Sequence, residues 1–275
     1  MNNLAGKVAI VSGSGRGIGR AIALKLARHG ARLVVNDLDD APGAAVVDEI
    51  KALGGEAVAV NGDVTQPGFA DRFVGAAMER LGGLDIIVNN AGYTWDATVQ
   101  KMTDEQFQAM LDVHLVAPFR ILRAAAEPIR MLAKQDAEAG REVFRKVVNI
   151  SSIAGLYGNA GQASYSSAKA SLIGLTRTMC KEWGRYKVNV NCVAFGLIRT
   201  RLTQAIEAQQ ATIDVAGREI KVGVQPQFLS TVEKLVPLGR GGTPEEAAGA
   251  VYLFCTPESN YISGQIVTCG GGLLM

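Results

Sequence analysis

The sequence has little net charge, few cysteines and few prolines. Its 28 Lys and Arg residues nearly balance 26 Asp and Glu residues, and the basic residues are scattered, so we expect no surface for nucleic acid. The four cysteines and two histidines lack metal-ligand spacing, which predicts no metal site and buried structural thiols in a reducing compartment. With 8 prolines and 48% hydrophobic residues, the chain is expected to form a sizeable core.

Segments for targeting or membrane insertion are also missing. The chain begins with Met-Asn-Asn-Leu-Ala-Gly-Lys, which is not a basic start followed by an apolar core, and no apolar run is long enough to cross a bilayer. We therefore expect a cytoplasmic protein without a membrane partner. No linker or composition shift divides the chain, which predicts a single domain over residues 1–275.

Glycine is abundant instead: the 32 residues have no collagen-like period and suit tight turns between strands and helices. Apolar runs alternate with amphipathic stretches along the chain. This alternation predicts an α/β fold, a doubly wound parallel sheet of the Rossmann type with helices on both faces. The expected strands cover 7–12, 32–36, 57–61, 84–88, 147–150, 188–193 and 264–268, and the expected helices cover 18–29, 44–53, 69–81, 103–134, 163–183 and a segment beginning at 243.

Three segments depart from this rhythm. Pro118 and Pro128 are expected to kink or divide the 103–134 helix, and the polar segment 135–142 is expected to form an exposed loop. Residues 201–237 mix short apolar and polar pieces after a strand, which predicts a substrate lid. The apolar residues that favour an apolar substrate in this lid are Ile206, Ile213, Val215, Val222, Val224, Phe228 and Leu229.

A glycine-rich turn between Gly13 and Gly19 joins the first strand to the first helix. A strand, a glycine turn and a helix in this order point free backbone N–H groups at a phosphate. The strict G-x-G-x-x-G pattern is not met, because Ile18 stands where its third glycine would be. The alternative is a glycine-rich turn without a ligand.

Asp37 closes the second strand. An acidic residue about 20 residues beyond the glycines accepts hydrogen bonds from a ribose 2′-hydroxyl and repels a 2′-phosphate, which favours NAD over NADP. Arg16 argues for the reverse, since a guanidinium in the glycine turn is able to hold that phosphate. Asp37 ranks higher because no basic residue follows it. Its alternative role is an N-cap for the next helix.

The segment 146–178 combines a strand, a loop rich in Ser and Gly, and a helix. Tyr165 and Lys169 are four residues apart on the helix, so they share one face. Ser152 follows the carboxyl end of the strand, where open α/β sheets bind ligands. The ammonium stabilises a phenolate, so Tyr165 is predicted to exchange a proton near neutral pH while Ser152 bonds the reacting oxygen. In isolation, such a Tyr–Lys pair is more often a surface pair.

Together these motifs resemble the short-chain dehydrogenase/reductase family, and most closely its 3-oxoacyl-acyl-carrier-protein reductases. The resemblance covers essentially the whole chain, and its specificity comes from five motifs in the family's order. The motifs are SGSGRGIG at 12–19, Asp63-Val64, NNAG at 89–92, the set of Ser152, Tyr165 and Lys169, and LGRGGTPEEAAGAVYLF at 238–254.

The resemblance implies a role for each matching residue. Tyr165 is the implied general acid/base, Lys169 holds the nicotinamide ribose and lowers the Tyr165 pKa, and Ser152 orients the substrate carbonyl. The implied NAD contacts are Gly13, Arg16, Gly17, Ile18 and Gly19 at the pyrophosphate and adenosine ribose, Asp37 as the selector of NAD, Asp63 and Val64 at the adenine, Asn90, Ala91 and Gly92 along the cleft, and Ile198 and Thr200 at the carboxamide end.

Three positions depart from the family pattern. His114 stands where the family has an Asn that holds a water of the proton relay; an imidazole donates and accepts, so His114 is a relay residue or a packed histidine. Phe195-Gly196 replaces the usual Pro-Gly after the sixth strand, which places an aromatic ring near the floor of the site. Cys269 replaces the usual Asp before the terminal glycine pair.

The predicted function is the NAD(P)-dependent interconversion of a secondary alcohol and a ketone. The favoured substrate is a 3-oxoacyl or 3-hydroxyacyl thioester, and Arg199 and Arg201 are candidates for contacting a carrier protein. The alternatives are a steroid-like or cyclic alcohol, or a catalytically silent NAD-binding regulator on the same fold. A methyltransferase is disfavoured, because its site would not need Tyr165 and Lys169 at this spacing. The resemblance also implies a homotetramer, in which the apolar tail Leu273-Leu274-Met275 would be buried.

Overall fold

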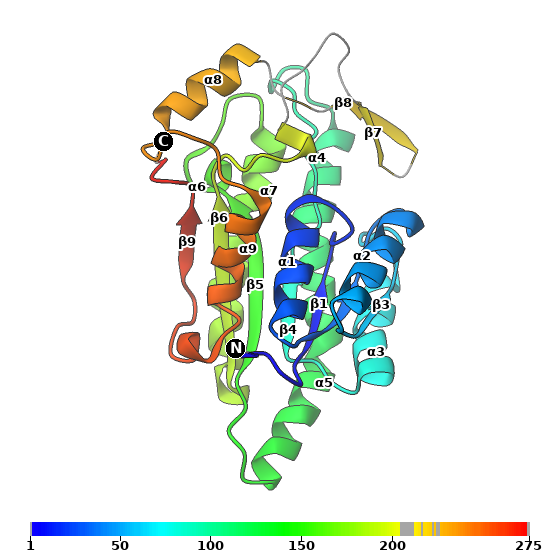
Figure 1. The fold of residues 1–275 in the computed structure, drawn as a ribbon. Helices are drawn as coiled ribbons and strands as arrows, with labels where there is room; N and C mark the ends of the chain where they lie inside the picture. Colours follow the sequence, from blue (N-terminus) through cyan, green and yellow to red (C-terminus); the bar gives the residue numbers. More distant parts are fainter. Residues whose placement is uncertain (1, 204–211, 216, 222, 224–225, 274–275) are drawn as a thin grey trace.

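The computed structural model describes residues 2–203, 212–215, 217–221, 223 and 226–273. Seven parallel strands form one sheet in the order β3-β2-β1-β4-β5-β6-β9 (Figure 1). This sheet confirms the predicted doubly wound fold. Its strands are β1 (Val8–Val11), β2 (Arg32–Val35), β3 (Ala57–Ala59), β4 (Ile86–Asn89), β5 (Arg145–Ser152), β6 (Val188–Phe195) and β9 (Ile266–Cys269).

Two layers of helices cover the sheet, because successive side chains of a strand point to opposite faces. The helices are α1 (Gly17–Arg28), α2 (Asp40–Ala52), α3 (Phe69–Leu81), α4 (Asp104–Leu111), α5 (Ala117–Glu138), α6 (Ile153–Tyr157), α7 (Ala163–Trp183), α8 (Pro226–Leu235) and α9 (Pro244–Leu253). In β1, Ala9 and Val11 pack in one core with α1, α2 and α9, whereas Val8 and Ile10 pack in a second core with α3, α4, α5 and α7 (Figure 1).

The strand order changes direction between β1 and β4. From β1 the chain continues to β2 and β3 on one side, and then crosses to β4, β5 and β6 on the other. Open sheets bind ligands outside the carboxyl ends of the strands at such a point. The carboxyl ends of β1, β4 and β5 all lie at this end of the sheet, and the glycine turn, NNAG and Ser152 are found there.

The predicted helix over 103–134 is divided, but not by its prolines. Helix α4 begins with a capping box between Thr103 and Gln106, and residues Asp112–Val116 then form a π-helical turn that leads into α5. This turn lies upstream of Pro118 and Pro128. Pro118 occupies the first turn of α5, where its missing N–H costs little.

The prediction of an exposed loop over 135–142 is wrong for its first half, because α5 continues to Glu138. Asp136 is buried and forms ion pairs with Arg141 at 2.8 Å and with Arg145 at 2.7 Å. Burial raises the pKa of Asp136, but the hydrogen bonds from Arg145 and Arg141 outweigh burial and hold it below its usual value. Some polar residues of this segment are therefore exposed, whereas Asp136 belongs to a buried ion-pair cluster.

The predicted lid over 201–237 contains regular structure after β6, contrary to the irregular segment that the sequence suggested. A β-hairpin of β7 (Thr212–Val215) and β8 (Arg218–Lys221) is followed by α8, and both lie at the carboxyl-end side of the sheet (Figure 1). Several apolar lid residues of the prediction lie outside the described residues; they are Ile206, Val222, Val224 and the side chain of Phe228.

Burial of the thiols and of the C-terminal tail differs in part from expectation. All four cysteines are free, but only Cys192 and Cys255 are buried, whereas Cys180 and Cys269 are half-buried. Leu273 is buried within its own chain against α6 and α8, while residues 274–275 lie outside the described part. None of the described helices is both long enough and apolar enough to cross a membrane.

Candidate active site

The start of α1 presents backbone N–H groups to the crevice. Arg16 is the N-cap of α1, and its side chain makes no capping hydrogen bond, so these N–H groups remain available to an anion. Gly13 has a φ of +62°, and a Cβ at this position would lie 2.7 Å from the Cα of Ala91. A Cβ on Gly19 would overlap the carbonyl oxygen of Gly13. The predicted glycine turn is therefore a compact cradle that side chains would fill.

The segment Asn90-Ala91, which follows the neighbouring strand β4, holds this glycine cradle in place through hydrogen bonds. Asn90 Nδ2 donates hydrogen bonds to the carbonyl oxygens of Ser12 and Gly13, both at 3.0 Å. Ser12 Oγ accepts the backbone N–H groups of Asn90 and Ala91 at 3.0 and 3.1 Å. These bonds give Asn90 a structural contribution that the sequence did not reveal.

Asp37 lies directly beyond β2, with its side chain against Gly15. The residue is 8% exposed, its Oδ1 accepts the backbone N–H of Asp39 at 3.1 Å, and a Cβ on Gly15 would overlap its Oδ2. The guanidinium of Arg16 forms an ion pair with Asp39 at 2.8 Å. Arg16 is the residue of the glycine turn that would favour NADP, and its guanidinium is thus already paired with a carboxylate.

Asp63-Val64 and Ile198–Thr200 complete the rim of the crevice. Asp63 Oδ1 accepts the backbone N–H and the hydroxyl of Thr65 at 2.8 and 2.7 Å, and Val64 is buried in the second core. The methyl group of Thr200 would be 4.0 Å from a Cβ on Gly17, so this segment faces the start of α1. Ile198 is buried.

Ser152, Tyr165 and Lys169 are brought together at the carboxyl end of β5. Ser152 caps the short helix α6 by accepting the backbone N–H of Ala154 at 3.2 Å, and it also hydrogen-bonds to Tyr165. Lys169 is buried, and its Nζ donates to the carbonyl oxygen of Ile150 at 2.8 Å. Its Nζ lies 5.7 Å from the centroid of the Tyr165 ring. A phenol, an ammonium and a hydroxyl in this arrangement are suited to proton transfer at a carbonyl.

The proton affinity of Tyr165 differs from the expectation. Burial raises the pKa of Tyr165 to about 12; the hydrogen bond from Ser152 opposes this change and the charge of Asp96 adds to it. Burial also lowers the pKa of Lys169 to about 8. Lys169 is not among the groups that shift the pKa of Tyr165, and desolvation, which favours the protonated phenol, is the largest cause of the shift.

His114 lies in the π-helical turn and is 2% exposed. Its Nε2 lies 2.8 Å from the carbonyl oxygen of Tyr93, which assigns the hydrogen to Nε2 because a carbonyl only accepts. Nδ1 is buried and has no hydrogen-bond partner among the described residues. The ring stands edge-on to Tyr165, with centroids 5.1 Å apart. Burial and the charge of Lys169 hold the His114 pKa well below its usual value, so the imidazole is neutral.

The aromatic residue that replaces the family's proline lies next to Ser152 at the carboxyl end of the sheet. Phe195 is the last residue of β6, where it is paired with Ser152 on β5 and with Cys269 on β9. It is 6% exposed and packs in the core with α1 and α9. Close packing continues after it, because a Cβ on Gly196 would lie 2.7 Å from the Cα of Gly270.

Sequence reasoning missed residues at the mouth of the site. Asp96 accepts a hydrogen bond from Gln162 at 2.7 Å, and Arg218 of the hairpin forms an ion pair with Glu105 at 2.8 Å. The guanidinium of Arg218 also lies 5.9 Å from the ring of Trp95. Only their positions in the sequence could have pointed to these residues: Asp96 closely follows NNAG, and Gln162 precedes Tyr165 by one helical turn.

The hairpin contact predicts an effect on substrate binding. Arg218→Met removes the ion pair with Glu105 and the contact with Trp95, two exposed interactions worth roughly 1 kcal/mol together. Because the hairpin is then held less firmly, we expect the KM for the ketone to rise by at most roughly fivefold. The dissociation constant of NADH should stay the same in fluorescence titrations. Arg130→Met is the matched control, because it removes an exposed ion pair on α5 instead. An equal KM in all three proteins would contradict a role of the hairpin in binding.

The residues of the crevice fit a nicotinamide dinucleotide. Its diphosphate needs the free N–H groups of α1, and its ribose hydroxyls find a carboxylate at Asp37 and an ammonium at Lys169. The space that Gly13 and Gly19 leave beside the helix allows close approach of a phosphate. A bound dinucleotide supplies the hydride acceptor or donor.

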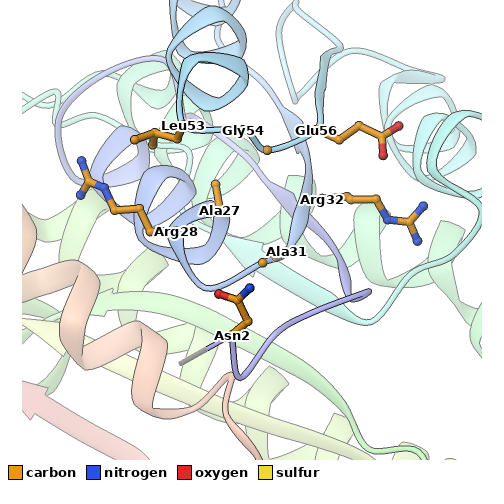
Figure 2. Close-up of a pocket in the computed structure, with 10 residues that line it drawn as sticks. Asn2, Ala27, Arg28, Ala31, Arg32, Leu53, Gly54 and Glu56 are labelled. Atoms are coloured by element: carbon orange, nitrogen blue, oxygen red, sulfur yellow. The ribbon is translucent and has the colours of Figure 1, made fainter.

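A hollow at the opposite end of the sheet has charged side chains but no free N–H groups of a helix start (Figure 2). It lies between the carboxyl ends of α1 and α2, where helix dipoles disfavour an anion. Arg28 and Arg32 point to opposite sides of this hollow, and Asn2 points into it. The crevice at the carboxyl ends of the strands is therefore the candidate active site.

Comparison with known proteins gives the same assignment. The family model described as short chain dehydrogenase matches residues 7–211. A 3-oxoacyl-[acyl-carrier-protein] reductase of Synechocystis sp. is 37% identical over 100% of both chains. A hydroxyacyl-CoA dehydrogenase of Mycobacterium tuberculosis is 41% identical over 95% of this chain and 81% of its own length.

A solved structure is similar over the full chain. The crystal structure of a putative gluconate dehydrogenase from Agrobacterium tumefaciens has a TM-score of 0.84 and 32% sequence identity, and the match covers 99% of this chain and 98% of that chain. The chain therefore belongs to the short-chain dehydrogenase family, and it is an oxidoreductase that interconverts a secondary alcohol and a ketone with a nicotinamide cofactor.

Proposed function

We propose that the protein is an NAD-dependent 3-hydroxyacyl thioester dehydrogenase, which also acts in reverse as a 3-oxoacyl reductase. The observation that carries this proposal is the convergence of Ser152, Tyr165 and Lys169 beside the glycine cradle. The acyl thioester is supported by the relatives, one named a hydroxyacyl-CoA dehydrogenase and another a 3-oxoacyl-[acyl-carrier-protein] reductase.

Each of the three residues has a separate task in this proposal. Ser152 donates a hydrogen bond to the substrate oxygen, on which negative charge develops during reduction. Tyr165 gives its phenolic proton to that oxygen, and takes the proton back in the direction of oxidation. Lys169 holds the ribose next to the reacting carbon and stabilises the phenolate by its charge. The raised pKa of Tyr165 favours the form that donates a proton.

The proposed cofactor is NAD rather than NADP. Asp37 stands at the end of β2, where a carboxylate accepts the ribose 2′-hydroxyl and repels a 2′-phosphate. Asp39 neutralises Arg16, the basic residue of the glycine turn. A 2′-phosphate would therefore meet the carboxylate of Asp37 without an unpaired basic side chain at Arg16.

The charges around the mouth favour a small thioester over an acidic carrier protein. Arg199 forms an ion pair with Glu233 at 2.7 Å, and Arg218 is paired with Glu105. Of the two arginines considered for carrier-protein contact, only Arg201 has no ion pair among the described residues. One unpaired guanidinium is a weak basic surface for a carrier protein.

A panel of ketones tests the substrate class. Acetoacetyl-coenzyme A, an acetoacetyl carrier protein, a cyclic ketone and a steroid ketone are compared by kcat/KM with NADH. We expect the highest value for acetoacetyl-coenzyme A. A higher value for the cyclic or steroid ketone would reject the thioester, and binding of NADH without turnover of any ketone would favour a silent regulator.

His114 is proposed to take part in proton delivery. Its Nδ1 is a buried acceptor beside Tyr165 and suits a water molecule that donates to it. His114→Asn should retain activity within about tenfold, whereas His114→Leu should lower kcat by 10- to 100-fold. Measurement of kcat in protonated and deuterated water gives a second readout, because slower proton delivery increases the solvent isotope effect. Equal kcat values for His114→Leu and the unmodified protein would identify a packing residue.

We propose a homotetramer in the cytoplasm. Two groups of exposed apolar side chains support association: Phe107, Phe119 and Met131 on α4 and α5, and Leu253, Tyr261, Ile262 and Val267 around α9 and the edge strand β9. Sedimentation equilibrium should give the mass of four chains, and a monomer at micromolar concentration would contradict this proposal. The four free thiols are consistent with a reducing compartment.

A further inference from the structure

Asn36 is a buried asparagine that directly follows β2. The residue is 1% exposed, so its side chain does not form part of the open surface of the crevice. Strand β2 lies between β1 and β3, and the three strands end level with one another, because Val35 is paired with Val11 of β1 and with Ala59 of β3. Asn36 therefore lies between the glycine turn after β1 and the segment after β3.

The side chain of Asn36 connects these two segments. Its Oδ1 accepts the backbone N–H of Gly13 at 3.0 Å. Its Nδ2 donates to the carbonyl oxygens of Val60 and Gly62, both at 3.1 Å. The orientation of this amide is unambiguous, because the reverse orientation would set the NH₂ group against an N–H group and the oxygen against two carbonyl oxygens. The side chain thus ties the glycine turn to the segment after β3.

The backbone around Asn36 is anchored to the same two segments. The N–H of Asn36 donates to Ser14 Oγ at 3.0 Å, and its carbonyl oxygen accepts the N–H of Ser14 at 2.6 Å. The carbonyl oxygen of Asp37 accepts the N–H of Gly62 at 2.9 Å. Asp37 is therefore held between the glycine turn on one side and the segment after β3 on the other.

We propose that Asn36 is a positioning residue for the adenosine half of the dinucleotide: its side chain sets the separation between the glycine turn, Asp37 and the segment that carries Asp63. These three parts are the proposed contacts of the diphosphate, the ribose and the adenine, and each follows a different strand. Both polar atoms of the Asn36 side chain are bonded to backbone groups. Asn36 therefore acts through its neighbours and does not touch the cofactor itself.

Contacts that are held in place before the ligand arrives lower the cost of ordering them on binding. In Asn36→Leu, the new side chain has the same branching, but the N–H of Gly13 and the carbonyl oxygens of Val60 and Gly62 lose their partner. Buried groups without a partner shift towards water or other groups. This shift should separate the glycine turn from Asp37 and weaken binding of the adenosine half. Asn36→Ser is a milder second variant, because its hydroxyl is too short to connect both segments.

Asn191→Leu is the matched control. Asn191 is also 1% exposed, its Oδ1 accepts the N–H of Gln265 at 3.0 Å, and its Nδ2 donates to the carbonyl oxygen of Ile262 at 2.9 Å. These bonds tie β6 to the segment before β9 and involve none of the proposed cofactor contacts. We expect Asn191→Leu to lower the melting temperature as Asn36→Leu does, but to leave the affinity for the cofactor unchanged.

Two ligands locate the effect on the cofactor. Fluorescence titration gives the dissociation constant of NADH, and calorimetry gives that of ADP-ribose, which has the adenosine half but no nicotinamide. We expect both constants to rise by roughly tenfold in Asn36→Leu and by roughly threefold in Asn36→Ser, whereas kcat at saturating NADH should stay within about twofold. A higher dissociation constant with an unchanged kcat separates positioning of the adenosine half from damage to the catalytic residues.

Equal dissociation constants of ADP-ribose for the unmodified protein and both Asn36 variants would overturn the inference. An equal weakening in Asn191→Leu would also overturn it, because the effect would then follow from lower stability alone. The inference rests on the proposed cofactor site but not on the substrate. If no thioester is turned over, the proposed function fails, while binding of ADP-ribose still decides the role of Asn36.

Discussion

Tyr165→Phe is expected to lower kcat by at least roughly a thousandfold while the dissociation constant of NADH changes less than about twofold. The phenylalanine keeps the ring that packs against His114 but lacks the proton that the substrate oxygen must receive. Positioning by Ser152 and the bound cofactor remains, so a small residual rate is expected. Stopped-flow measurement of a single turnover gives the chemical step, and fluorescence titration gives NADH binding.

Tyr157→Phe is the matched control, because Tyr157 lies on the neighbouring helix α6 and is 48% exposed. It removes one hydroxyl near the site without removing the proposed acid, and its kcat should stay within about twofold. If Tyr165→Phe retained more than a tenth of the activity, Tyr165 would not be the general acid/base.

Asp37→Ser is expected to change the preference between NADH and NADPH by two to three orders of magnitude. Loss of a charged hydrogen-bond acceptor costs about 1.5–3 kcal/mol of NADH binding, which is a factor of about 10 to 150 in kcat/KM. Removal of the carboxylate also removes its repulsion of a 2′-phosphate. Addition of Asp39→Ala should improve NADPH use further, because it releases Arg16 from its ion pair.

Asp40→Ser is the control for this experiment. Asp40 is the exposed first residue of α2, so its loss changes the net charge equally but should leave the cofactor ratio the same. The ratio of kcat/KM with NADH to that with NADPH is measured for all variants. The N-cap of α2 is Asp39 and not Asp37, so an unchanged ratio in Asp37→Ser would leave Asp37 as a residue that only holds the turn before α2, through its bond to the Asp39 N–H.

The sequence was sufficient for the fold because each strand is a short buried run. In β1 and β4 every residue is buried, and the apolar pattern reports such strands directly. The glycine turn, Ser152, Tyr165 and Lys169 follow from the strand ends, since local spacing fixes where each lies. The positions of these site residues are therefore set by residues that are close to them in the sequence.

The parts that escaped prediction depend on residues distant in the chain. Arg218 meets Glu105 across 113 positions, and Asp96 meets Gln162 across 66 positions. Local polarity gives no sign of such pairs. Asp136 is a further case, because its charge suggested exposure whereas Arg145 stabilises it in a buried position.

The proton affinity of Tyr165 was mispredicted for a physical reason. The spacing to Lys169 indicated a charge that lowers the pKa of Tyr165, but the degree of burial has no local signature in the sequence. Desolvation is the largest effect on the Tyr165 pKa in the structure, and it raises this pKa. The burial of His114 likewise has no local signature in the sequence; burial and the charge of Lys169 hold its pKa well below the usual value.

The most direct test of the account is the oxidation of NADH by acetoacetyl-coenzyme A, followed at 340 nm and compared with NADPH under the same conditions. The account predicts rapid turnover with NADH, slow turnover with NADPH and a product that the enzyme oxidises again with NAD. Equal or faster turnover with NADPH would contradict the role of Asp37. No turnover of the thioester with either cofactor, by a protein that binds NADH, would contradict the proposed function.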